Sequence, residues 1–112
     1  MVEEIKNATV IETVRDYVGY IDDPVFDAEL LSNINTAIAI AYQLGVVTSD
    51  FINVNRNTKW SQIISEDVAE YKYPLVVQYI NVRTKILFDP PPSNSKEMFE
   101  SLIQELAYRL KC

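Results

Sequence analysis

The chain has 112 residues, 48% apolar and 23% charged, with 10 basic against 16 acidic side chains and a formal charge of −6. This length and apolar content predict one domain, residues 1–112, with a sizeable core. Because histidine is absent, Ser-His-Asp and Cys-His catalysis are excluded and the commonest transition-metal ligand is missing. The lone Cys112 excludes an internal disulfide framework, and no apolar run is long enough for a membrane span. We therefore expect no enzyme, no cofactor and no metal site.

Two helices are predicted in the first half of the chain. The first begins near Thr9, since Thr9 and Glu12 fit a capping box, and it ends at Gly19, which can adopt the left-handed conformation. The second runs over about residues 27–44, with Asp27 as its N-cap. Its apolar residues lie on more than one side, as expected of a central helix.

Residues 46–65 have weak periodicity and many Asn, Thr and Ser residues, which predicts an irregular loop or a short hairpin that is mobile. Four apolar residues in this segment are candidates for a partner-facing surface: Phe51, Ile52, Val54 and Trp60. An equally open interpretation is that the large ones fold back and close one end of the helical bundle.

Two more helices are predicted in the second half. The third covers residues 73–88 and has Pro74 in its first turn, where a missing N–H costs nothing. A stiff hinge of three prolines, residues 90–92, precedes the fourth helix, at about 94–110. One side of this fourth helix carries an apolar stripe that is a candidate partner interface: Phe99, Leu102, Ile103, Leu106 and Leu110. The alternative is that the stripe packs wholly within its own subunit.

The densest acidic cluster comprises Asp22, Asp23, Asp27 and Glu29. Carboxylates of this kind can hold a hard cation, but Pro24 interrupts the cluster and its spacing does not match an EF-hand loop. A solvated turn with helix-capping acids is the preferred interpretation. The predicted fold class is accordingly a small all-α, four-helix domain with an irregular loop or hairpin between helices two and three.

Five stretches carry a family resemblance: residues 14–23 (VRDYVGYIDD), 26–37 (FDAELLSNINTA), 41–46 (AYQLGV), 79–91 (YINVRTKILFDPP) and 105–110 (ELAYRL). In this order and spacing the sequence resembles small head–tail connector (adaptor) proteins of tailed bacteriophages. The resemblance spans nearly the whole chain, and the apolar helix ending in Leu-Phe-Asp-Pro-Pro is its most telling part.

The resemblance implies a structural virion protein at the head–tail junction, assembled in the host cytoplasm. It implies a ring of about twelve copies that docks under the portal protein, extends the DNA channel and receives the next tail-completion protein. In such a ring, the four apolar residues of the segment 46–65 are candidates for the contact between subunits, and the apolar stripe of the fourth helix is the candidate portal interface. The negative charge agrees with DNA passing without sequence-specific binding. The alternative function from the residues alone is a small acidic helical regulator or inhibitor-type binding module.

Overall fold

The computed structural model describes residues 2–19, 24–45, 53–64, 68–88 and 90–111. In these ranges the fold is all-α and contains no strand, and an isolated antiparallel bridge joins Thr9 and Lys59. The elements in chain order are α1 (Val2–Asn7), α2 (Val10–Val18), α3 (Pro24–Tyr42), α4 (Trp60–Ile63), the 3₁₀ helix η1 (Glu70–Lys72), α5 (Tyr73–Phe88) and α6 (Ser93–Lys111). The predicted all-α class is confirmed, while the short helices α1 and α4 were not predicted.

Local signals set the ends of α2. The Thr9 hydroxyl accepts a hydrogen bond from the backbone N–H of Glu12 at 3.4 Å, as an N-cap does. Gly19 has a φ of 83° and its N–H donates to the carbonyl of Arg15, which ends the helix in the left-handed conformation. Both predicted ends of this helix are confirmed.

The beginning of α3 corrects the sequence analysis. The helix begins at Pro24 and ends at Tyr42, so Asp27 lies inside the first turn and is not the N-cap. Proline is well suited to a first helical position because its fixed φ is already helical. The predicted bounds of α5 are confirmed, and α6 extends one residue beyond the predicted helix at each end.

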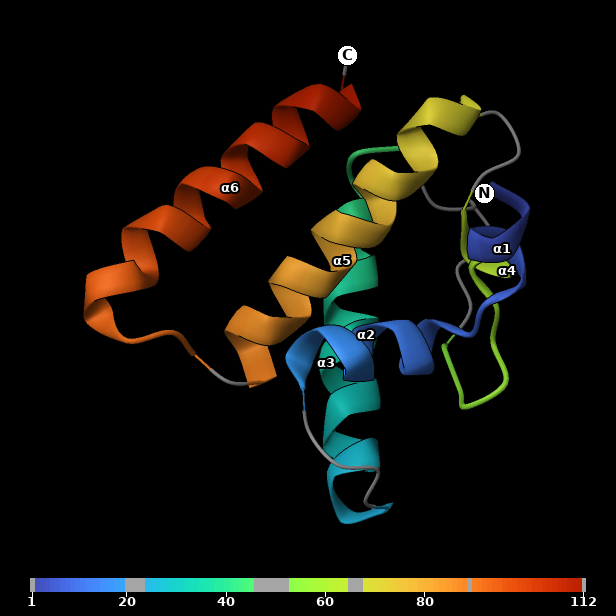
Figure 1. Ribbon diagram of the computed structural model, residues 1–112, viewed down its shortest axis with the longest axis horizontal. Coiled ribbons are helices and arrows are strands. Elements are labelled where there is room, and N and C mark those ends of the chain that lie inside the picture. The colour runs from blue at the N-terminus through green and yellow to red at the C-terminus, as the bar shows by residue number, and fades with distance from the viewer. Residues whose placement is uncertain (1, 20–23, 46–52, 65–67, 89, 112) are drawn as a thin grey trace.

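Helix α5 is the centre of the fold, and α3, α2, α6, η1 and α1 all pack against it (Figure 1). Helix α6 runs antiparallel beside α5 and packs chiefly on that helix (Figure 1). The short helices α1 and α4 lie together on the other side of the molecule (Figure 1). Ile38 of α3 and Ile80 of α5 are buried in one continuous apolar core, which agrees with the central position predicted for α3.

Candidate assembly surfaces

The segment 53–64 is held against the helices by hydrogen bonds. The backbone N–H of Val54 donates to Oδ1 of Asn35 at 2.7 Å, and Nδ2 of Asn35 donates to the carbonyl of Val54 at 3.4 Å. One α3 amide thereby satisfies both backbone groups of a residue outside the helices, as a strand partner does in a sheet. Val54, one of the candidate contact residues, is buried in its own subunit.

Trp60 is fully buried at the beginning of α4. Its indole N–H donates to the hydroxyl of Thr13 at 3.0 Å, and its backbone N–H donates to the carbonyl of Ala8 at 3.2 Å. This arrangement agrees with the interpretation in which the tryptophan closes the helical bundle of its own subunit. Contact between Trp60 and a neighbouring subunit stays a prediction, and it requires the side chain to leave this site.

The structure tests the other expectations for residues 46–65 only in part. Phe51 and Ile52 lie outside the described residues, as does the rest of 46–52. In the described part, a one-turn helix at Trp60–Ile63 stands where a loop or hairpin was expected, and no strand pairs within it. The mobility expected of 46–65 stays a prediction.

Asp27 is the clearest correction among the candidate sites, because its side chain is only 3% exposed. Its carboxylate accepts hydrogen bonds from Arg15 of α2, at 3.3 Å between Nη2 and Oδ1, and from Arg56 of the segment 53–64. A buried carboxylate is tolerated when cations pair with it. Asp27 therefore ties α2, α3 and the segment 53–64 together, and it is not part of a solvated acidic turn.

The apolar stripe of α6 faces its own subunit. Ile103, Leu106 and Leu110 are buried, and Phe99 and Leu102 are partly buried against the same core. These side chains contact a portal only if α6 leaves α5, so their role as a portal interface stays a prediction. The outer side of α6 is exposed and includes Met98, 64% exposed, and Tyr108, 70% exposed.

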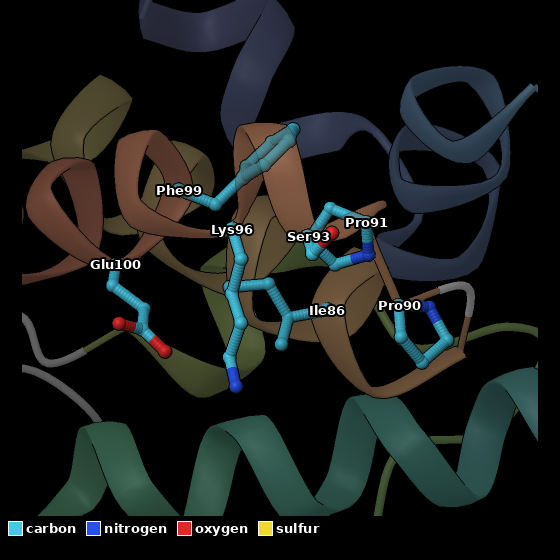
Figure 2. Close-up of a pocket in the computed structure, with 7 residues that line it drawn as sticks. All are labelled: Ile86, Pro90, Pro91, Ser93, Lys96, Phe99 and Glu100. Atoms are coloured by element: carbon cyan, nitrogen blue, oxygen red, sulfur yellow. The ribbon is translucent and has the colours of Figure 1, made fainter.

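Two adjoining hollows follow one side of the contact between α5 and α6; together they are called the α5–α6 groove. Figure 2 shows the larger, about 260 Å³, and the smaller is about 210 Å³. Ile86 and Glu100 line both hollows. The larger is also lined by Pro90, Pro91, Ser93, Lys96 and Phe99, and the smaller by Arg83, Ile103 and Gln104. The groove has an apolar floor and a rim of mixed charge.

The described residues bring together no group of three or more His, Cys, Asp or Glu side chains that could hold a metal ion. Within the same residues, no helix is both long and apolar enough to cross a membrane. Burial raises the pKa of the Tyr17 hydroxyl above its ordinary value, so this phenol is neutral at physiological pH.

The described residues form a small all-helical protein whose last helix follows a triproline linker. Residues 10–112 match the family model described as "Phage connector protein". The chain therefore belongs to the phage connector family, and the resemblance noted in the sequence is confirmed. No curated protein and no solved structure matched the chain. Members of this family are structural proteins.

Proposed function

We propose that this protein is a ring-forming head–tail connector that docks under the portal, extends the DNA channel and receives the next tail-completion protein. The observation that carries the proposal is the family match, which extends over residues 10–112 and includes every helix except α1. Assembly in the host cytoplasm, followed by residence at the head–tail junction, is part of the same proposal.

The charge of the chain supports a role in a DNA channel. A protein that neutralises several phosphates releases counterions and binds DNA tightly, which would hinder DNA sliding. With 16 acidic against 10 basic side chains, this chain has the opposite balance. A ring of acidic subunits repels the DNA backbone and lets it pass without sequence-specific binding.

We propose that α6 meets the portal with its outer side. The inner stripe already packs on α5, whereas Tyr108 and Met98 are exposed on α6. Tyrosine is enriched among the residues that dominate interface energies, because it buries a large ring and keeps a polar tip. The Glu105–Arg109 ion pair, 2.9 Å between Oε1 and Nη2, flanks Tyr108 and adds a polar rim.

The experiment combines the purified chain with the portal protein of the same virus and records particle mass and electron-microscope images. We expect a closed ring on the portal for the wild-type chain and at least about tenfold weaker binding for Tyr108→Glu, since a hot spot contributes about 2 kcal/mol. Ser61→Glu, an exposed change on α4, is the matched control and should bind normally.

The alternative function, a small acidic regulator or inhibitor, predicts a different result. A regulator remains a monomer or dimer in the presence of the portal and binds a basic partner surface instead. A wild-type chain that forms no complex with the portal would overturn the connector proposal.

A further inference from the structure

The α5–α6 groove is an open surface with an apolar floor. Its larger hollow, of about 260 Å³, is lined by four apolar residues: Ile86, Pro90, Pro91 and Phe99 (Figure 2). The two prolines have no backbone N–H, so they contact an occupant without requiring a hydrogen-bond acceptor from it. Residues that dominate interface energies are large side chains seated in pockets from which water is excluded. The groove therefore fits one or two apolar side chains of a partner.

The rim of the groove carries a small excess of positive charge. Arg83 and Lys96 line it together with one acid, Glu100. The chain as a whole has the opposite balance, with a formal charge of −6. Because opposite charges across an interface steer the partners and fix their register, this rim favours an occupant that has an acidic group beside its apolar residues.

A segment of this chemistry is present in the chain itself, at residues 46–52, which lie outside the described residues. Its sequence is VVTSDFI, so four of its seven residues are apolar. Its one charged residue, Asp50, directly precedes Phe51 and Ile52. The carboxylate of Asp50 complements the positive rim of the groove, and the two apolar side chains that follow complement its floor.

The segment 46–52 cannot reach the groove of its own subunit. Phe51 is two positions before Asn53, and two residues of extended chain span at most about 7 Å. The following residue, Val54, is held to Asn35 of α3 by two hydrogen bonds. The segment 53–64 lies on the side of the molecule away from α6, with α3 and α5 between them (Figure 1). Because a single helix is already about 10 Å across, Phe51 is too close to this anchor to pass around α5.

We propose that in the ring the segment 46–52 of one copy docks in the α5–α6 groove of the next copy, with Phe51 on the apolar floor and Asp50 beside Lys96. This inference rests on the proposed function, because it names the contact between subunits of the ring. A closed head-to-tail ring joins two different surfaces of each subunit, and these face away from each other when many copies complete the circle. The anchored segment and the groove have this arrangement (Figure 1). Tyr108 does not line the groove and remains available to the portal.

Cysteine cross-linking tests this contact directly. In a Cys112→Ser background, Ser49→Cys places one thiol on the segment 46–52 and Ser93→Cys places another on the lining of the larger hollow. In rings assembled on the portal, a short reagent that joins two thiols should link neighbouring chains and produce a ladder of multiples on a denaturing gel. The free chain should give no cross-linked product, because the segment does not reach its own groove. Each single-cysteine variant is a control and should give no ladder.

Substitutions test the two parts of the contact separately. Phe51→Ala should weaken ring formation at least about tenfold, because it removes the apolar anchor, and should leave the urea midpoint of the free chain unchanged. Asp50→Lys and Lys96→Glu should each weaken ring formation, and the chain that carries both should recover it, because opposite charges again meet across the contact. Ser49→Ala is the matched control and should form rings normally.

The outcomes separate this contact from the proposed function. Rings that form without a ladder, or that form normally with Phe51→Ala, would overturn the docking and leave the connector function intact. Single-chain products in the free protein would also overturn it, because they would place the segment in its own groove. A product that joins the groove thiol to the portal would assign the groove to the portal instead. A wild-type chain that forms no ring would overturn the connector function, and the docking with it.

Discussion

The indole N–H of Trp60 donates a hydrogen bond to the hydroxyl of Thr13 at 3.0 Å, although the two residues are 47 positions apart in the chain. Trp60 is fully buried, and this hydrogen bond satisfies the indole nitrogen, the only polar atom of its side chain. The pair fixes α4 against α2 and brings the segment 53–64 into the core.

Trp60→Ala should destabilise the protein by about 3–5 kcal/mol, because it removes a fully buried aromatic side chain and leaves a cavity. Trp60→Phe keeps most of the apolar volume and should cost much less. Urea unfolding followed by circular dichroism measures both. An unchanged unfolding midpoint for Trp60→Ala would show that the tryptophan does not support the folded subunit.

Asp27→Asn should destabilise the protein by about 3 kcal/mol, because it leaves Arg15 and Arg56 beside a neutral amide in a largely buried site. This free energy is at the low end of the range for removing one partner of a buried ion pair, because the Arg56 side chain is itself half exposed. Asp16→Asn, on the exposed side of α2, is the matched control and should change the unfolding free energy by less than about 0.5 kcal/mol. Equal effects of the two changes would argue against the buried ion cluster.

Ile80→Asp and Ile38→Asp should each unfold the protein, since an unpaired buried carboxylate costs several kcal/mol against a total stability of about 5–15 kcal/mol. Ala39→Asp lies beside Ile38 on the exposed side of α3 and should keep native helicity. Far-ultraviolet circular dichroism and the melting temperature are the measurements. Native melting of both isoleucine variants would mean that α3 and α5 do not form the core.

Leu106→Ala in the inner stripe of α6 should cost about 2–4 kcal/mol, because the side chain is 5% exposed. Gln104→Ala, on the exposed side of the same helix, should be nearly neutral.

A chain that ends after Pro92 should be destabilised, since the loss of α6 uncovers the apolar side of α5. Urea unfolding measures this change as well. If the shortened chain kept the full unfolding free energy, α6 would contribute nothing to the isolated subunit.

Two residues should be exceptions to the mobility expected of residues 46–65: the amides of Val54 and Ile64 should exchange slowly with solvent in the free protein. Val54 donates to Oδ1 of Asn35 and Ile64 donates to the carbonyl of Trp60, and both residues are buried. The amides of Asn53 and Ser61, in exposed residues of the same segment, provide the comparison. Hydrogen exchange by NMR measures all four, and rapid exchange at Val54 and Ile64 would show that the segment is not anchored in solution.

The sequence by itself determined the local features of this protein. The cap at Thr9, the stop at Gly19 and the bounds of α5 depend on side chains and backbone preferences within a few residues of each site. Apolar periodicity likewise identified the apolar stripe of α6, whose Ile103, Leu106 and Leu110 are buried. The family followed from the order of such local patterns along the chain.

Only the tertiary structure decided which distant groups meet. Periodicity shows which side of a helix is apolar but not what covers it, so it left open whether the stripe of α6 and Trp60 pack inside the subunit. Asp27 looked like a capping acid because its partners, Arg15 and Arg56, are 12 and 29 positions away. Pairing between charges at such separations depends on how α2, α3 and the segment 53–64 come together, which no local pattern specifies.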